Sequence, residues 1–569
     1  MNAQALLHIP ESNYCFPVDK NEIVLRFRTD RNDCFEQVEV VYESKYFIYE
    51  RQKSSVMQLA YQDKEFNYYE TKLTLDDVRL AYVFRLTKEG KTYYFSEDRL
   101  TKEYDFSLAY YNSFQVAYIN ENDVHQMVPW MKRAVFYQIF PDRFCMKDEK
   151  KDKSYITWNW GDIPKPKGFA GGDLQGIISK LDYLKELGIT ALYLNPIFKS
   201  ISNHKYDIED YKEIDPMFGT KEDFKELVQE LHKRNMKIVL DAVFNHCSSN
   251  LKEFQDVVSK GKDSQYFDWF VIHGDYVDMD HCNYEVFSSC EYMPKFNTSN
   301  VHAQDFLIDI ATYWIKEYDI DGWRLDVSDE VSHEFWRRFR REVKMQKDDF
   351  VIIGENWHDA NSYLRGDQYD SIMNYAFTKA CLDYYVFETL DAEGLANKLS
   401  SLILRNTDQV NRMMLNLLDC HDVDRFYTRV NKNKNKLLSA LAVTNMFIGT
   451  PCVYYGTEIP LEGGFDPDNR RCFDWDESHW DQAYMSLLKQ ILHLRTIETV
   501  QNGNISFHTE NDVFYLSRRE KDQEVILITN ESGVAKQVQI EGNVVLQNLY
   551  EDHTLKNDGF VVVKVDRNK

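Results

Sequence analysis

The chain has 569 residues, of which 43% are hydrophobic and 28% charged, and its formal net charge is −24. So negative a chain is a poor ligand for nucleic acid or for an anionic membrane surface, because both attract basic patches. It contains no apolar run close to the about 20 residues that cross a bilayer and no secretory signal at its start, so we expect a cytoplasmic protein.

Residues 1–122 alternate apolar and polar side chains in short stretches separated by polar turns, which predicts an antiparallel β-sandwich. The clearest stretches are 22–28, 38–42 and 80–86. Aromatic residues crowd the later half of this region, and they include Tyr93, Tyr94, Tyr110 and Tyr111. They could form a binding face, but the pattern favours packing inside the sandwich.

From residue 123 the pattern changes to short apolar strands that alternate with amphipathic helices. Eight strands are predicted, at 134–141, 189–197, 237–244, 322–327, 351–355, 371–377, 414–419 and 452–456. Helical patterns between them include 174–187, 221–234, 302–318 and 332–344. Eight strand–helix units favour the α/β class and a (β/α)8 TIM barrel. An open doubly wound sheet is the alternative, but no glycine-rich phosphate loop follows any strand.

The connection between the third and fourth strands is far longer than a normal barrel loop. We interpret it as an inserted subdomain over the C-terminal face of the barrel, where barrel enzymes place their active sites. After a helix that ends near residue 496, alternation returns and predicts a C-terminal β-domain. The predicted domains are the sandwich at 1–122, the barrel at 123–246 and 301–498, the inserted subdomain at 247–300 and the C-terminal β-domain at 499–569.

Polar side chains follow four of the predicted strands. In one of them Arg324 and Asp326 share a side, opposite Leu325 and Val327, because strand side chains alternate. Arg324 would then lower the pKa of the Asp326 carboxyl and keep it ionised, as a nucleophile requires. An ordinary structural pair is the alternative. The other three strand ends carry Asp241, Asn245 and His246, then Glu355, Asn356 and Trp357, and finally His421 and Asp422. Their convergence on one rim favours an active site.

These residues favour carboxylate chemistry over the alternatives. Zinc takes clusters of His and Cys, whereas the ten cysteines contain no CxxC pair, and they are expected as reduced thiols. The adjacent pairs at 246–247 and 281–282 do not match zinc spacing. A serine hydrolase would need a Gly-x-Ser-x-Gly elbow, which is absent. Two carboxyl groups, one ionised and one able to keep its proton, form the pair used in glycoside hydrolysis.

Four segments resemble the signature regions of glycoside hydrolase family 13, the α-amylase family, in that family's order and spacing. They are 241–246, 322–326, 354–358 and 418–422. A fifth, 293–297, resembles the form typical of the neopullulanase, cyclomaltodextrinase and maltogenic amylase subgroup, and 171–176 and 202–207 point to the same subgroup. The resemblance covers nearly the whole chain and implies that the sandwich is similar to a family 34 carbohydrate-binding module.

The resemblance implies a role for each residue of the rim. Asp326 would be the nucleophile, Glu355 the general acid/base, and Asp422 the third carboxylate, which holds sugar hydroxyls. The substrate-binding residues would be Arg324, His246 and His421 at the cleavage point, His204 and Tyr206 on the same ring with Tyr206 stacking, Trp357 on the leaving-group side, and Asp466 and Arg470 at the next glucose outward.

The chain departs from this subgroup beside the acid/base. Asn356 stands where Ile is usual, and Ser328 and Asp329 stand where Ala and Asn are usual. These differences bear on the acceptor side of the cleft.

It also departs in the loop after the first barrel strand, where relatives bind calcium. Met146 and Lys151 stand at positions usually occupied by asparagine, which leaves Asp148, Asp152 and Asp173. Calcium takes about six to eight oxygen ligands, and a lysine side chain can replace the ion electrostatically. We therefore expect no bound metal, with calcium disfavoured, and no organic cofactor.

The sequence thus predicts a retaining α-glucan hydrolase acting on cyclodextrins, maltooligosaccharides, pullulan or starch, at α-1,4 bonds and with α-1,6 bonds as a further target. A transglycosylase or α-1,6-glucosidase of the same family is one alternative. A catalytically inactive glycan-binding relative is another, disfavoured because all three carboxylates are present. The resemblance also implies a homodimer in which the sandwich covers the cleft of the second subunit.

Overall fold

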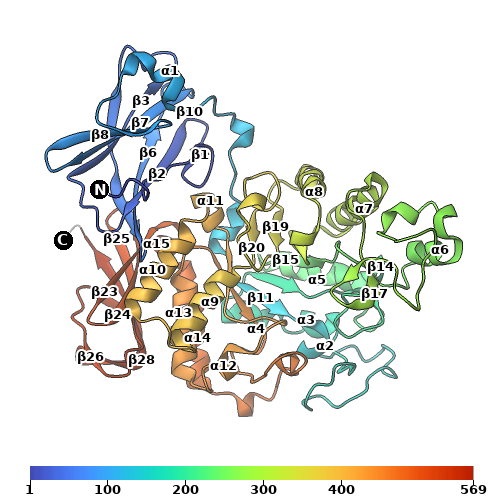
Figure 1. Ribbon diagram of the computed structural model, residues 1–569. Helices are drawn as coiled ribbons and strands as arrows, with labels where there is room; N and C mark the ends of the chain where they lie inside the picture. Colours follow the sequence, from blue (N-terminus) through green and yellow to red (C-terminus); the bar gives the residue numbers. More distant parts are fainter. Residues whose placement is uncertain (568–569) are drawn as a thin grey trace.

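Figure 1 shows the computed structural model of the chain, which describes residues 1–567. Residues 568–569, the end of the predicted C-terminal domain, lie outside the described residues. A central α/β barrel carries an N-terminal β-sandwich, drawn in blue, and a C-terminal β-domain, drawn in red, both at the left of the view. The predicted fold class is confirmed.

The barrel has eight parallel strands in the order β20-β19-β18-β15-β12-β11-β22-β21. A parallel bridge between Met373 and Leu415 joins the two end strands and closes the sheet. Helices cover the outside and side chains fill the inside, which explains why the strands are apolar on both faces. The strands are β11 Phe136–Ile139, β12 Ala191–Leu194, β15 Lys237–Ala242, β18 Gly322–Leu325, β19 Val351–Gly354, β20 Ser371–Ile372, β21 Leu415–Leu417 and β22 Thr450–Tyr454.

The sixth strand is shorter than predicted. The apolar run at 371–377 was assigned to a strand, but β20 ends at Ile372 and the helix α9, Tyr375–Tyr385, begins within the run. Asn374 accepts a hydrogen bond from the Phe377 N–H at 3.2 Å and so caps this helix. A short apolar run fits a strand or a buried helix equally well, so periodicity alone does not separate the two.

Most helical patterns form one helix each, namely α5 Lys221–Lys233, α7 Val301–Tyr318 and α8 His333–Gln346. The pattern at 174–187 instead forms two, α3 Leu174–Ile178 and α4 Leu181–Leu187. At the start of α5, Thr220 and Asp223 form a reciprocal capping box. The other helices of the barrel region are α2 Pro141–Phe144, α10 Ala392–Ile403, α11 Asp408–Asn411, α12 Phe426–Arg429, α13 Lys434–Met446, α14 Gln482–His493 and α15 Glu498–Asn502.

The N-terminal domain consists of two antiparallel sheets, ordered β1-β2-β6-β5 and β4-β3-β7-β8-β9, with β10 paired to β7. Tyr93 packs against the core between them, whereas Tyr110 and Tyr111 are 67% and 81% exposed. Placing these two tyrosines in the core was wrong, because they lie on the short surface helix α1, Ala109–Asn112. The strands are β1 Cys15–Asp19, β2 Glu22–Asp30, β3 Gln37–Ser44, β4 Lys53–Val56, β5 Gln58–Gln62, β6 Phe66–Thr74, β7 Leu80–Lys88, β8 Lys91–Ser96, β9 Arg99–Thr101 and β10 Phe114–Val116.

The long connection between β15 and β18 carries the helix α6, Lys252–Lys260, and a hairpin of β16, Val286–Phe287, and β17, Cys290–Pro294. A bridge between His246 and Lys295 attaches the hairpin to the chain just after β15. The C-terminal domain is one antiparallel sheet. Its strands are β23 Asn504–Glu510, β24 Val513–Glu520, β25 Gln523–Asn530, β26 Lys536–Gln537, β27 Asn543–Glu551 and β28 Thr554–Asp566.

Arg26 fastens the sandwich to the barrel. Its side chain is 1% exposed, with Nε 2.7 Å from Glu70 Oε2 and Nη2 2.6 Å from Asp408 Oδ1 in α11. Because Arg26 is buried while both carboxylates are partly exposed, removing either carboxylate leaves the buried guanidinium with one ionic partner fewer, so the contact links the two domains. Within residues 1–567, none of the helices combines the length and the apolar content that a bilayer crossing requires.

Candidate active site

A cleft of about 520 Å³ opens where the barrel strands end. It is lined by ten of the eleven predicted site residues, namely His204, Tyr206, His246, Asp326, Glu355, Trp357, His421, Asp422, Asp466 and Arg470. The eleventh, Arg324, is 1% exposed and contacts two of the lining carboxylates from β18. Parallel strands all end at one face, so residues far apart in sequence meet there. Their individual roles stay predictions.

Arg324 is the cation on which the carboxylates converge. Its Nη1 lies 2.7 Å from Asp326 Oδ1 and 2.9 Å from Asp241 Oδ1, and its Nη2 lies 3.1 Å from Glu355 Oε1. A guanidinium is a planar, rigid fork of donors. It therefore holds Asp326 and Glu355 close together and in a fixed mutual orientation.

Arg324 lowers the pKa of Asp326 as expected, but it does not hold that pKa below its usual value. Burial raises the pKa of Asp326, Arg324 opposes the rise, and the nearby Glu355 and Asp241 add to it, so the pKa lies well above its usual value. The sequence shows one arginine beside one aspartate, but in the structure one guanidinium serves three acids. Its charge is therefore shared.

Glu355 accepts hydrogen bonds from neighbours on both sides. The Val327 N–H donates to its Oε2 at 2.9 Å, and Trp357 Nε1 donates to its Oε1 at 3.3 Å. Val327 was predicted to continue a strand, but β18 ends at Leu325 and Val327 adopts φ 45° and ψ 44°. A β-branched residue rarely takes this left-handed conformation, and here it is the conformation in which the Val327 N–H meets Glu355.

Trp357 supplies an aromatic surface to the cleft. Its ring lies flat on Tyr375, with centroids 3.7 Å apart and an interplanar angle of 5°. The tryptophan remains 44% exposed. A fixed, exposed ring of this kind can pack against the apolar face of a sugar.

Asp422 belongs to a chain of polar contacts on the opposite wall. Its Oδ1 lies 3.2 Å from His421 Nε2 and 3.6 Å from Arg470 Nη2, and Arg470 Nη1 lies 3.0 Å from Asp466 Oδ1. Burial, followed by repulsion from Glu355, raises the pKa of Asp422 to about 7. Near neutral pH this group can therefore either donate or accept a hydrogen bond from a sugar hydroxyl.

The three histidines of the cleft are neutral at neutral pH. Burial lowers the pKa of His246 to about 3 and that of His204 to about 4, and it lowers the pKa of His421 well below its usual range. Tyr206 lies parallel to His421, with centroids 5.5 Å apart, and its hydroxyl donates to Asp241 Oδ2 at 2.9 Å. Neutral rings suit an uncharged ligand better than a phosphate or a carboxylate.

The inserted subdomain supplies a wall of the cleft that sequence reasoning missed. Phe287 of β16 stacks on His246 at 4.6 Å, and Cys290, Tyr292 and Met293 of β17 lie beside it in the lining. The sequence feature that came closest to predicting this wall was the segment 293–297, the fifth segment that resembles the family's signature regions. The other lining residues outside the prediction are Val327, Asp329 and Glu330.

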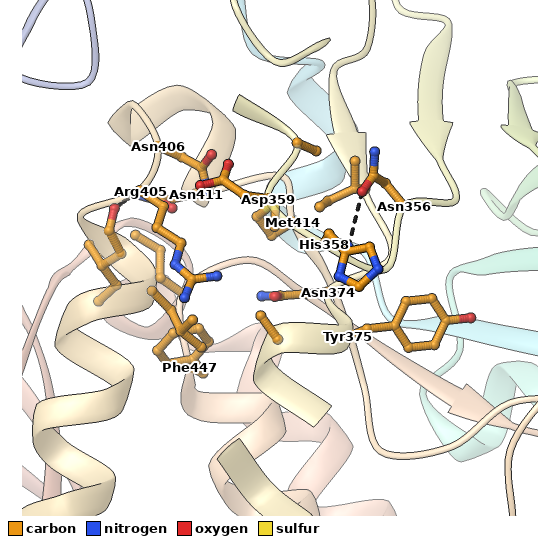
Figure 2. A pocket seen from close by; sticks show the side chains of 16 residues that line it. Asn356, His358, Asp359, Asn374, Tyr375, Arg405, Asn406, Asn411, Met414 and Phe447 are labelled. Carbon is orange, nitrogen blue, oxygen red and sulfur yellow. Dashed lines mark hydrogen bonds between the residues drawn. The ribbon is translucent and has the colours of Figure 1, made fainter. Parts of the chain in front are cut away.

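A small cavity of about 30 Å³ borders the loop that follows Glu355 (Figure 2). Its lining includes Asn356, Asn374, Tyr375 and Arg405, and it shares no lining residue with the cleft. Asn356 is 3% exposed, and its Oδ1 accepts the His358 N–H of the same loop at 3.1 Å, which is the dashed line in Figure 2. The volume has room for about two water molecules.

The loop after β11 is the place where the resembled family binds calcium, but in this chain the loop does not fit such an ion. Lys151 Nζ lies 2.9 Å from Asp173 Oδ2, 2.5 Å from the Gly171 carbonyl oxygen and 3.2 Å from that of Met217. The lysine side chain is 3% exposed. An ammonium group donates three hydrogen bonds, so Lys151 takes the oxygens that a cation would otherwise need.

Among residues 1–567, one group of three metal-ligand types has its atoms within 4.8 Å of one another, and it consists of Cys420, His421 and Asp422. Burial raises the pKa of the Cys420 thiol, whereas metals bind the thiolate. Cys420 instead accepts the Asp422 N–H at 3.4 Å. The group therefore fits a role in shaping the cleft. All ten cysteines of the chain are free.

A (β/α)8 barrel whose strand ends bring three carboxyl groups onto one guanidinium, with that of Asp422 in the same cleft, fits the class of glycoside hydrolases. Comparison with known families agrees with this class. The family described as "Alpha amylase, catalytic domain" matches residues 138–522, and "Alpha amylase, N-terminal ig-like domain" matches residues 1–120. The chain belongs to the alpha-amylase family.

Individual similar proteins indicate which subgroup of the family the chain resembles. The cyclomaltodextrinase of Thermoanaerobacter pseudethanolicus is 38% identical over 537 residues, which cover 94% of this chain and 93% of that protein. Neopullulanase 2 of Thermoactinomyces vulgaris is 38% identical over 551 residues, which cover 95% and 93%. A solved cyclomaltodextrinase structure matches with a TM-score of 0.91 and 35% identity, covering 100% of this chain and 98% of that one. The resemblance to this subgroup is confirmed.

Proposed function

We propose that this chain is a retaining hydrolase of α-glucans that cleaves α-1,4 bonds, and α-1,6 bonds where the substrate offers them. The observation that carries the proposal is the contact of Asp326 and Glu355 with the two terminal nitrogens of Arg324. Retaining enzymes keep their two carboxyl groups about 5–5.5 Å apart, closer than inverting enzymes do. The names of the similar proteins, cyclomaltodextrinase and neopullulanase, support cyclodextrin and pullulan as substrates beside maltooligosaccharides and starch.

The reaction follows from the placement of these groups. Glu355 donates its proton to the glycosidic oxygen while an oxygen of Asp326 attacks C1, so the C1–O bond breaks and a glycosyl ester forms. Glu355, now a carboxylate, then takes a proton from water, and the water oxygen attacks C1 and releases Asp326. One water is consumed for each bond cleaved. Asp422 and Arg470 hold sugar hydroxyls throughout.

Two measurements test this proposal. Proton NMR of the first sugar released should show the α anomer, because two displacements restore the starting configuration. A β anomer would indicate a single displacement and reject Asp326 as the nucleophile. Chromatography of separate incubations with cyclodextrin, pullulan, soluble starch and maltotriose gives the substrate order. No turnover of any of them would favour the inactive glycan-binding alternative.

We also infer that the chain forms a homodimer through its N-terminal domain. Tyr46, Phe47 and Tyr49 are 53%, 42% and 53% exposed, and Tyr110 and Tyr111 are more exposed still. The two segments are neighbours, because a shared small cluster of buried residues contains Ile48, Ala81 and Ala109. They lie at the end of the domain far from the barrel (Figure 1). Contiguous exposed aromatics of this kind mark interaction surfaces.

The ten free cysteines support the expected reducing, cytoplasmic location.

Light scattering tests the dimer. The full chain should be dimeric, and the double change Tyr110→Ser with Tyr111→Ser should yield monomers whose activity on cyclodextrin falls more than that on soluble starch. Deleting residues 1–122 should act in the same direction if the barrel stays folded. Tyr118→Ser is the matched control, because Tyr118 is 50% exposed in the same domain but outside these two segments. A full-length monomer that already prefers cyclodextrin would reject the idea that the sandwich covers a second subunit's cleft.

A further inference from the structure

Ser328 connects the end of the nucleophile strand to the main chain of the acid/base. It follows Asp326 by two residues, is 0% exposed, and donates its hydroxyl to the carbonyl oxygen of Glu355 at 2.6 Å. We infer that Ser328 is a positioning residue for Glu355, which it holds at the orientation needed to protonate the leaving oxygen. The inference rests on the proposed function, in which Glu355 is the acid/base.

Ser328 is itself held from the opposite direction. Its carbonyl oxygen accepts the Trp336 Nε1–H at 2.8 Å and the Tyr369 hydroxyl at 2.9 Å, and both aromatic residues are 0% exposed. Strand β19 comes close because Gly354 has no side chain, since a Cβ there would lie 3.0 Å from Ser328 Oγ. The serine is therefore an anchor that cannot shift without disturbing buried rings.

The residue between Asp326 and Ser328 adds a second contact to Glu355. The left-handed backbone of Val327 directs its N–H to Glu355 Oε2 at 2.9 Å. Unfavourable backbone conformations of this kind persist where the surrounding structure imposes them, and they cluster at active sites. The dipeptide at 327–328 thus holds both the carboxylate and the main-chain carbonyl of Glu355.

The acid/base loop is also bordered by a cavity. Asn356 lines the cavity of Figure 2, and its Oδ1 accepts the His358 N–H of the same loop. Glu355 is held through both its main chain and its carboxylate, and the contacts from Ser328 and Val327 supply one of each kind.

The test compares two substrates in the variant Ser328→Ala. For maltotriose, kcat should fall about tenfold, the order expected from losing one hydrogen bond, while KM stays within about twofold. For an aryl maltoside with a nitrophenol leaving group, kcat/KM, which reports the first displacement and not the hydrolysis of the glycosyl ester, should fall less than about threefold, because that group needs little protonation. Ser371→Ala is the matched control. Ser371 is also 0% exposed and donates to a main-chain carbonyl, that of Met413, at 2.6 Å, but it does not line the cleft.

Three results would overturn the inference: an unchanged kcat in Ser328→Ala, an equal fall on both substrates, or the same pattern in Ser371→Ala. If Ser328→Ala does not fold, Ser328→Cys keeps the size and donates more weakly, so it carries the same comparison. The variant Glu355→Gln tests the proposed acid/base function of Glu355 independently of the inference about Ser328. If the aryl substrate does not rescue Glu355→Gln, the acid/base assignment fails, whatever Ser328→Ala shows.

Discussion

Replacing Lys151 by Met should destabilise the barrel, whereas a chelator should not. Lys151 Nζ contacts one carboxylate oxygen and two carbonyl oxygens, and its partner Asp173 has 0% of its side chain exposed. Methionine keeps the length and apolar stem of the side chain but removes the ammonium. The change therefore isolates the charge and the three hydrogen bonds.

The size of the effect follows from these contacts. Removing one partner of a buried ion pair costs about 3–5 kcal/mol. Asp173 would still accept the N–H groups of Lys147, Asp148 and Gly176, so we expect the lower end, about 3 kcal/mol. An unfolding entropy of about 2 cal/mol/K per residue gives about 0.8 kcal/mol/K for residues 138–522, which cover most of the barrel, the inserted subdomain and the first two strands of the C-terminal domain. The Tm should therefore fall by about 4 °C.

Scanning calorimetry at one fixed scan rate checks both statements, because irreversible unfolding makes Tm depend on that rate. Lys150→Met is the control, since Lys150 lies exposed in the same loop, and it should shift the Tm by less than about 1 °C. EDTA should leave the wild-type Tm unchanged. A fall of several degrees in EDTA that calcium restores would refute the reasoning, as would equal Tm values for the two lysine variants.

Two further predictions concern aspartates. Asp326→Asn should lower hydrolysis by about 10³-fold or more while oligosaccharide binding persists in calorimetry, because the amide cannot form the glycosyl ester; near-normal turnover would exclude the nucleophile role. For Asp321, burial raises the pKa, but hydrogen bonds from His232 and Lys347 help bring it down to about 2, below the about 3.9 of an unfolded chain. Its about 2 kcal/mol of stability is therefore present above about pH 4 and lost towards pH 2. The difference in unfolding free energy between wild type and Asp321→Asn should shrink over that range, and a constant difference would contradict the assignment.

The barrel could be predicted from the sequence because strands buried on both faces appear as short apolar runs, and all eight runs became barrel strands. The exceptions have local causes. Asn374 converts the end of one run into a helix start through a single side-chain hydrogen bond. Tyr110 and Tyr111 belong to a surface helix of four residues, which is too short to leave a periodic pattern.

The site residues that lie at strand ends could be predicted from the sequence. Those that lie on the inserted subdomain or in strained turns could not. His246 was found because it follows β15, whereas Phe287, which stacks on it, comes from a hairpin about 40 positions later whose placement depends on tertiary contacts. The left-handed Val327 had no signal either, because its conformation is imposed by the neighbouring strand end. A local sequence pattern predicts which side chains lie at the end of a strand. It does not predict which residues of an inserted subdomain pack against them.

The net rise in the Asp326 pKa, despite the neighbouring Arg324, comes from burial and from the acid groups crowded around it. Arg324 contacts Asp241, Asp326 and Glu355 together, and the histidines around them are neutral, so acid groups outnumber cations at the point of cleavage. Glycoside hydrolysis passes through a transition state with positive charge near C1. The acid groups that are ionised stabilise that charge more than they stabilise a neutral sugar, which is the requirement for catalysis. Burial, followed by repulsion from Glu355, raises the pKa of Asp422 to about 7. Burial and acid–acid repulsion, which a pairwise argument about one aspartate leaves out, therefore belong to the same environment that surrounds the transition state.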